Sequence, residues 1–405
     1  MPGAERASVA RQAAQAEPQN DLRPNAVPFR SEEMIEALDA AIRRYEQIAA
    51  KGNWPQIPGT RMIRPEDDDE RIPILRERLV KSGELRAQSG VWARSYSFDG
   101  ELMDSVRRFQ QNHGLRVTGR VDRTTIAALN VPVEARLQQL RINLDRLRGL
   151  MRDRPEDRYV LVNAAAFQLE AVERGEVQLR HRVVSGRAGR DTPEVQATIR
   201  ALNFFPQWRV PDSVATLELI PRVLKEPDYL EKEKIRVLAG HYNGPEIDPQ
   251  TVDWTTVTST QIKFRQDRGP QNALGLMRID MPNSEGVYMH DTPLKHLFGQ
   301  RSRAFSAGCV RVQDVFKLGE WIARYEPGWE APGRVEQVLA TNEPFDLVLT
   351  RPLPVYFAYI TAWAEPDGSI QFRPDIYGRD GHSTLTAGRE RDESEGPAPV
   401  AGLAP

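Results

Sequence analysis

The hydrophobic pattern of this chain changes its period near Pro155, and that change limits the folds available to it. Before Pro155, apolar residues recur at the three- and four-residue spacing of amphipathic helices. After it, apolar and polar residues alternate with the two-residue period of strands. A run of helices followed by a run of strands is typical of the α+β class. We therefore expect helical N-terminal units followed by a larger, sheet-based domain.

The N-terminal part divides into a lead-in and three helical units. Residues 1–30 lack periodicity, and we expect them to form a disordered lead-in. Ser31 can cap a helix that opens a scaffold segment at residues 31–65. Apolar spacing predicts three short helices within residues 66–132 and one linking helix within residues 133–157. The region is therefore expected to be all-α.

The strand pattern extends over residues 158–376, with turns between short apolar runs. A charged, helix-prone stretch at residues 211–250 interrupts it, and we interpret this stretch as a helical insertion between strands. Residues 377–405 are polar and contain glycine and proline, so we expect a disordered tail. The sheet-based domain is therefore the largest unit of the chain.

Composition excludes several classes of protein. The net charge of -2 provides no basic excess for bulk nucleic-acid binding. No apolar run approaches the length of about 20 residues that a membrane helix needs, and no signal peptide is visible at the start. A single cysteine rules out an internal disulfide and a multi-cysteine zinc site. His290 and His296 without a carboxylate cluster are a weak metal signal, and we expect no metal.

Cys309 is the only cysteine, and its surroundings suit a nucleophile. A helix is predicted from about Gln313, so the thiol would lie just before a helix N-terminus that favours the thiolate. Gly308 permits a sharp turn, and the backbone amides of Gly308 and Cys309 could hold an oxyanion. His290 ends a predicted strand and could act as the base, oriented by Asp291 or by a backbone carbonyl.

Other readings of these residues stay open. A lone cysteine is often only a small buried side chain, and His296 is a weaker alternative for the base. From the residues alone, the site predicts a cysteine–histidine acyl transfer, with either water or an amine as the acceptor.

Two long strings resemble known families. The segment from His290 to Val312, which contains His-Asp-Thr-Pro and Arg-Ala-Phe-Ser-Ala-Gly-Cys-Val-Arg-Val, resembles the signature of the L,D-transpeptidases with a YkuD-type catalytic domain. Residues 203–211 and 269–275 agree further. The segment from Leu102 to Asp122 is similar to the three-helix peptidoglycan-binding domain. The resemblance covers about residues 34–365 and is closest to the long Gram-negative members.

The resemblance implies a mixed, β-sandwich-like catalytic domain with a helical capping insertion. Its members cross-link peptidoglycan: the cysteine would capture a donor tetrapeptide as a thioester, and a diaminopimelate amine would then form a 3→3 cross-link. It further implies stem peptides as partners, no cofactor, a monomer, reaction with carbapenems, and a periplasmic location whose signal is not visible here. Products with 1→3 links and lipoprotein attachment stay open.

The resemblance also assigns roles to individual residues. Arg311 would lie near the nucleophile and suit a stem-peptide carboxylate, although a structural hydrogen bond is an alternative. Four further positions would line the pocket or simply pack: Tyr288, Trp208, Ser306 and Ala307. Many relatives have histidine at position 307 and glycine at position 291. The long Gram-negative branch tends to have a small residue and aspartate there, as in this chain.

Two other functions remain as alternatives. The first is a cysteine hydrolase of the same fold, such as an L,D-carboxypeptidase or an enzyme that detaches proteins from the wall. The second is a non-catalytic wall-binding scaffold, which would predict a lost nucleophile or base. The presence of both Cys309 and His290 argues against the scaffold.

Overall fold

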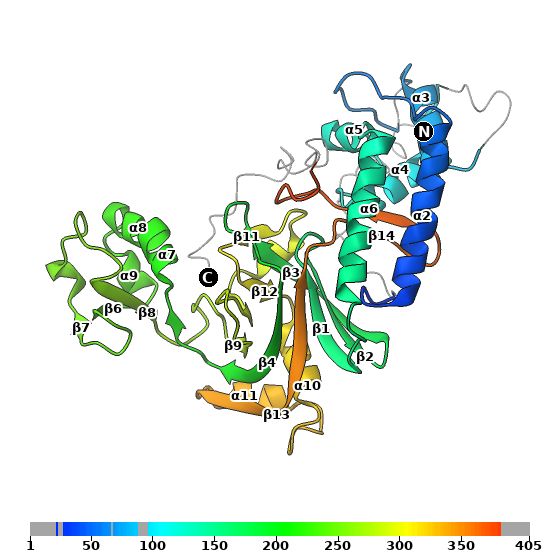
Figure 1. Cartoon of the computed structure of the whole chain (residues 1–405). Coiled ribbons are helices and arrows are strands. Elements are labelled where there is room, and N and C mark those ends of the chain that lie inside the picture. Colours follow the sequence, from blue (N-terminus) through cyan, green and yellow to red (C-terminus); the bar gives the residue numbers. More distant parts are fainter. Residues whose placement is uncertain (1–21, 23–26, 66–67, 88–95, 382–405) are drawn as a thin grey trace, which may run out of the picture.

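The computed structural model describes residues 22, 27–65, 68–87 and 96–381 (Figure 1). Helices come first and a sheet-based domain follows, which confirms the predicted α+β class. Within these ranges, no helix is long and apolar enough to cross a membrane. Most of the predicted lead-in and tail lies outside the described residues.

Two long helices form a layer beside the sheet-based domain (Figure 1). Ser31 caps α2 (Glu32–Ala50), because its Oγ accepts the Met34 N–H at 3.2 Å. Helix α2 packs along α6 (Val133–Leu150) and against the hairpin of β14 (Ala362–Ala364) and β15 (Ile370–Phe372). One hydrophobic cluster joins them, and it includes Leu38, Tyr45, Leu140, Leu144, Trp363 and Phe372. The predicted scaffold and linking helices therefore share a core.

Three short helices form a second helical unit, as the apolar spacing predicts. They are α3 (Ile72–Ser82), α4 (Gly100–Asn112) and α5 (Arg123–Leu129). Asp99 and Asp122 cap α4 and α5 through backbone N–H groups of the first turn. This unit has its own hydrophobic cluster, which includes Ile72, Leu79, Leu102, Phe109, Ile126 and Leu129.

A nine-stranded mixed sheet forms the centre of the large domain. Its strands are β1 (Arg158–Asn163), β2 (Gln168–Glu173), β3 (Glu176–Gly186), β4 (Val195–Phe204), β9 (Met277–Asp280), β10 (Met289–His290), β11 (Ala304–Ser306), β12 (Val310–Val312) and β13 (Phe345–Ala358). They run in the order β11-β3-β12-β10-β9-β4-β13-β1-β2, and β2 also pairs with β3. The sheet therefore curls back on itself, with the short strands β10 and β12 next to one another.

Two helices cover the core of this sheet. They are α10 (Val315–Ala323) and α11 (Arg334–Thr341). Leu318 and Ile322 of α10 join the buried cluster of the strands, together with Val183, Leu202 and Val310. This packing holds the buried face of the sheet, including β12, in place.

The insertion projects to one side of the central sheet (Figure 1). It holds the strands β5 (Trp208–Arg209), β6 (Ile235–Ala239), β7 (Glu246–Ile247) and β8 (Ile262–Gln266), paired in the order β5-β8-β6-β7. Its short helices are α7 (Asp212–Val214), the π-helix η2 (Ala215–Leu219), α8 (Ile220–Lys225) and α9 (Tyr229–Lys232). The insertion therefore contains a sheet besides its helices and extends beyond residues 211–250. Residues 235–239, predicted as helical, form a strand because Ile235 and Val237 alternate with the exposed Arg236.

Both ends of the described chain are more firmly anchored than their composition predicts. Phe29 is buried, and its N–H donates to Glu170 Oε1 at 2.9 Å. Asp380 is buried as well, and it accepts from Arg146 at 2.7 Å and from Thr361 at 2.6 Å. The expected lead-in through residue 30 and the expected tail from residue 377 are therefore wrong at their inner boundaries. Single anchor residues of this kind leave no periodic signal.

Candidate active site

The two predicted catalytic residues lie on neighbouring strands. His290 ends β10, and Cys309 directly precedes β12. The two strands are parallel, with His290 opposite Arg311 in register. Tyr288 directly precedes β10, and its carbonyl accepts the Val310 N–H at 3.0 Å. This hydrogen bond holds the backbone next to Cys309 against the start of β10. The loop between the two strands therefore brings the thiol and the imidazole to one region of the sheet.

His290 is held as a neutral base. Its Nδ1 donates to the Asp291 main-chain carbonyl at 2.5 Å. A carbonyl can only accept, so the proton is on Nδ1 and the lone pair is on Nε2. Nε2 is buried without a hydrogen-bond partner among the described residues. Burial, followed by the charge of Arg311, lowers the pKa of His290 from 6.5 to about 3.

Cys309 is a neutral thiol in this conformation. Its side chain is only 7% exposed, and burial raises the pKa of the thiol from 9.0 to about 11, although hydrogen bonds from Tyr288 oppose the rise. The expectation of a thiolate at a helix N-terminus is wrong. Strand β12 follows Cys309 immediately, and α10 begins only at Val315. The positive end of that helix therefore does not meet the sulfur.

The loop that carries Cys309 is fixed by two hydroxyl groups. Ser306 Oγ donates to the Cys309 carbonyl at 2.5 Å and accepts the Gly308 N–H at 3.2 Å. Thr192 Oγ1 donates to the Gly308 carbonyl at 2.8 Å. Gly308 has φ 128°, a conformation that favours glycine. Ser306 therefore holds the loop instead of lining a pocket, and the Gly308 amide, predicted for the oxyanion, is already engaged.

Asp291 supports the imidazole through its backbone and not through its carboxylate. The carboxylate accepts the Leu276 N–H at 3.0 Å and pairs with the Lys295 ammonium group. Of the two predicted orienting groups, the backbone carbonyl is the one that contacts His290. Gly275 leaves the room for this carboxylate, because a Cβ at that position would lie 2.3 Å from Asp291 Oδ2.

Substitution of Gly275 by alanine is expected to reduce activity without touching His290 directly. The added methyl group would displace Asp291 and thus the carbonyl that orients the imidazole. We expect the rate of enzyme acylation to fall by about 10- to 100-fold, the range produced by small misplacements of reacting groups. Mass spectrometry of the acylated protein over time measures this rate. Gly299→Ala is the matched control, since a Cβ there meets no atom within 4 Å, and equal rates for both variants would contradict the expectation.

Arginine side chains flank the imidazole. Arg311 lies opposite His290 on one side, and Arg278 of β9 lies opposite it on the other. Arg311 is 1% exposed, and burial lowers its pKa to about 10. The Arg278 guanidinium lies 5.5 Å from the centre of the Tyr288 ring. Sequence reasoning missed Arg278, although the alternation in Met277-Arg-Ile-Asp280 was a signal that could have indicated it.

The insertion contacts the site through a hydrophobic cluster. Trp208 is buried inside the insertion with Val210 and Phe264, so it is a core residue instead of an open pocket wall. Tyr288 and Ala307 pack against this cluster from the catalytic sheet. The insertion therefore packs against the catalytic sheet at Tyr288 and at Ala307, two positions before Cys309.

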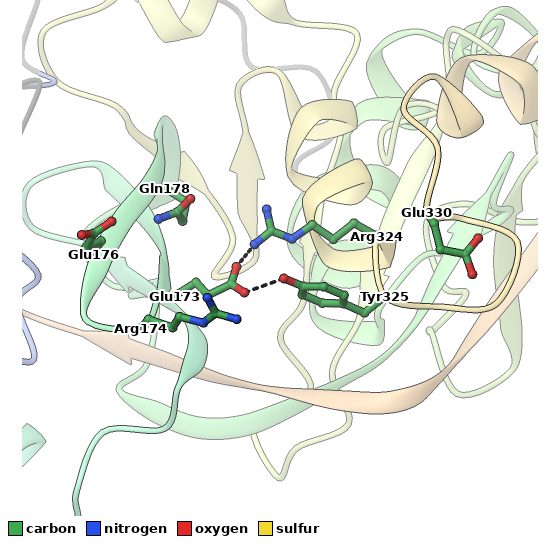
Figure 2. A pocket seen from close by; sticks show the side chains of 7 residues that line it. All are labelled: Glu173, Arg174, Glu176, Gln178, Arg324, Tyr325 and Glu330. Atoms are coloured by element: carbon green, nitrogen blue, oxygen red, sulfur yellow. Dashed lines mark hydrogen bonds and ion pairs between the residues drawn. The ribbon is translucent and has the colours of Figure 1, made fainter.

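A separate cavity of about 700 Å³ lies elsewhere (Figure 2). Its lining comes from the end of β2, the start of β3 and the segment that follows α10, and includes Glu173, Arg174, Glu176, Gln178, Arg324, Tyr325 and Glu330. The Ser306 carbonyl of the Cys309 loop accepts the Arg187 N–H, just beyond the other end of β3. Since β3 runs from Glu176 to Gly186, roughly 30 Å separates its two ends. This cavity is therefore not the catalytic site.

Two further histidines are held by the backbone. His113 and His181 are buried and bond main-chain carbonyls through Nδ1 at 2.8 Å. Among the residues that the structure describes, no three histidine, cysteine or acidic side chains are grouped to hold a metal.

The fold and the site together define a class: a sheet-based domain with cysteine and histidine on adjacent strands. Within that class, residues 157–336 match the L,D-transpeptidase catalytic domain, YkuD. Residues 68–129 match the family described as "Putative peptidoglycan binding domain". The chain therefore contains one region that matches the L,D-transpeptidase catalytic domain and one that matches a peptidoglycan-binding domain, as the resemblance predicts.

Individual relatives agree with the family match. A protein of Haemophilus influenzae (strain ATCC 51907 / DSM 11121 / KW20 / Rd) named "Putative L,D-transpeptidase" is 32% identical over 245 residues, which are 60% of this chain and 48% of the relative. The match thus spans about half of that protein. An L,D-transpeptidase structure from Stackebrandtia nassauensis is 13% identical, with 75% of this chain and 96% of that one covered and a TM-score of 0.26. One from Xylanimonas cellulosilytica is 14% identical, with 75% and 98% covered and a TM-score of 0.20.

The burial of His290 predicts a loss of stability in acid. The pKa of His290 is lower in the folded chain, so the unfolded chain binds the proton first and stability falls as pH drops from about 6.5 toward 3. For a histidine with these two pKa values, the free energy of unfolding at pH 5 is lowered by about 2 kcal/mol. The free energy of unfolding, measured with urea, should therefore fall less between pH 7 and pH 5 for His290→Gln than for the wild type. The exposed His241→Gln is the control, and equal losses for both variants would refute the expectation.

Proposed function

We propose that this protein is a peptidoglycan L,D-transpeptidase that acts through a cysteine thioester and forms 3→3 cross-links. The observation that carries the proposal is a neutral imidazole with a free Nε2 lone pair, placed one strand away from the only thiol, in a domain of the L,D-transpeptidase family. Because the substrate lies outside the cytoplasmic membrane, we also propose a periplasmic location. The three-helix unit α3–α5 would hold the protein to the wall.

In the first step, Cys309 Sγ attacks the carbonyl between the L-centre of diaminopimelate and the terminal D-alanine of a donor stem. The thiol proton passes to His290 Nε2 as the carbon–sulfur bond forms. His290 then returns that proton to the departing D-alanine amine, and the thioester remains. Since both groups are neutral at rest, the proton moves during the attack and no preformed ion pair is required.

In the second step, the side-chain amine of another diaminopimelate attacks the thioester. His290 takes a proton from this amine and gives it to the departing sulfur, which restores the neutral pair. The charges of the buried Arg311 and of the half-buried Arg278 disfavour a long-lived imidazolium, so proton transfer in both directions is expected to be rapid. The burial of Cys309 beneath the insertion favours an amine over bulk water as acceptor.

Incubation of the purified protein with tetrapeptide muropeptides, followed by mass spectrometry, tests the proposed reaction. Dimers joined through two diaminopimelate residues are the expected product. Tripeptide monomers alone would assign the protein to the hydrolases of the same fold. Absence of both products, from folded protein, would contradict catalysis and leave the wall-binding scaffold.

A further inference from the structure

A carboxylate from the insertion is bound by arginines of the catalytic domain. Glu218 lies in the π-helix η2, and its Oε1 accepts from Arg187 Nη2 at 2.7 Å. Arg190 Nη2 lies 3.9 Å from the same oxygen and also donates to the Ser213 carbonyl at 3.1 Å. Arg187 and Arg190 lie in the loop between β3 and β4, so these contacts tie the insertion to the catalytic domain.

A third guanidinium, that of Arg311, lies within electrostatic range of Glu218 and Arg187. Arg311 is 1% exposed, and its Nε and Nη1 have no hydrogen-bond partner within the described ranges. Both Glu218 and Arg187 are close enough to influence the pKa of Arg311. Two guanidinium groups therefore pair with the Glu218 carboxylate, and within the described ranges the buried Arg311 keeps two donor nitrogens without a partner. Such a cluster can accept more negative charge, and guanidinium groups match carboxylates in planar geometry.

The cluster is built into the walls of the proposed catalytic site. Arg311 follows Cys309 by two positions, and the Arg187 N–H donates to the Ser306 carbonyl at 3.0 Å. Ser306 in turn fixes the backbone of Gly308 and Cys309. A ligand carboxylate bound by these arginines would therefore lie beside the nucleophile.

We propose that Glu218 occupies the position of a donor-stem carboxylate and latches the insertion over Cys309 until a donor displaces it. Arg187, Arg190 and Arg311 would then form the carboxylate site for the donor. The identity of the ligand rests on the proposed function, whereas the latch does not. The closed state explains why the thiol is only 7% exposed, and release of Glu218 would free the arginines and the entrance together.

Alkylation of Cys309 by iodoacetamide tests the latch. This probe is small and neutral, so its rate reports access to the thiol and needs no substrate. Glu218→Gln should be alkylated at least about threefold faster than the wild type, as expected for loss of a partly buried ion pair. The control is Glu226→Gln, which changes a half-buried glutamate of the same insertion that pairs with Arg222 at 3.1 Å. Equal rates for all three proteins would overturn the latch.

Donors with one carboxyl group amidated at a time test the carboxylate site. Arg187→Ala should raise KM for the unmodified tetrapeptide by about tenfold or more and change kcat little, because a hydrogen bond to a charged group is lost. The donor that lacks the bound carboxylate should have a raised KM with the wild type. Its KM should rise little further with Arg187→Ala. Equal penalties for every donor would overturn the site.

The proposed function and the Glu218 latch can be tested separately. If the wild type forms no thioester with any tetrapeptide, the proposed function is wrong, and the alkylation rates still decide the latch. If the wild type cross-links normally while Glu218→Gln changes neither alkylation nor KM, the latch is wrong and the proposed function stands. A lower KM for Glu218→Gln, with kcat unchanged, would support the competition between Glu218 and the donor.

Discussion

Replacement of Cys309 by alanine is expected to remove all detectable acyl-enzyme and all cross-linked product. No other thiol exists in the chain, so no group can take over the thioester. The fold should survive, because the substitution removes one sulfur from a site whose loop is held by Ser306 and Thr192. The expected loss of stability is about 1 kcal/mol, which is small beside the effect on activity.

The measurement is muropeptide mass spectrometry together with thermal unfolding of the same preparation. Cys309→Ser serves as a second variant, since it keeps the size of the side chain and the contact with Tyr288 while providing a far weaker nucleophile. Cross-linked product at near wild-type levels from folded Cys309→Ala would show that the reaction does not pass through this residue.

The second large effect is expected for His290→Gln. Glutamine can still donate to the Asp291 carbonyl but cannot take a proton from the thiol, so the acylation rate should fall by about 10²- to 10⁴-fold. With the pKa of the thiol near 11, the variant should speed up as pH rises, because hydroxide must then generate the thiolate.

The wild type should not show this dependence of the acylation rate on pH. Since the pKa of His290 is about 3, the base stays neutral, and the acylation rate should stay level between pH 7 and pH 5. Single-turnover rates across this range provide the measurement. A rate that falls with a midpoint near 6.5, or a His290→Gln variant that acylates like the wild type, would contradict the assigned role.

The order of helices and strands could be predicted from the sequence, because periodicity reports which face of an element is buried. Ser31 as a helix cap and the strands around Arg158 are examples, since cap chemistry and alternation are local properties. The strand at Ile235–Ala239 was missed, because its charged neighbours resemble those of an exposed helix. Phe29 was missed for another reason: its burial depends on distant partners such as Glu170 and Trp363.

The candidate site was predicted in its residues but not in its electrostatics. Cys309 and His290 could be selected by residue type and order, and the structure places them on adjacent strands. Their protonation could not be predicted, because it depends on burial by segments far away in the chain. The helix predicted from about Gln313 is present as α10, but the three-residue strand before it gives no periodic signal, so the thiol was expected next to the helix.

The contacts that tie the insertion to the site are likewise invisible in the sequence. Glu218 and Arg187 are 31 positions apart, and nothing in the local pattern pairs them. Each resembles an ordinary surface charge until the fold brings the two elements together. Long-range ion pairs of this kind can be recognised only in three dimensions.

The most direct test of the central claim is the intact mass of the protein after brief exposure to a tetrapeptide donor without acceptor. A thioester on Cys309 should increase the mass by that of the donor minus D-alanine, and the adduct should map to Cys309 in peptide analysis and be removed by hydroxylamine. An unchanged mass in folded protein, or an adduct on any other residue, would contradict it.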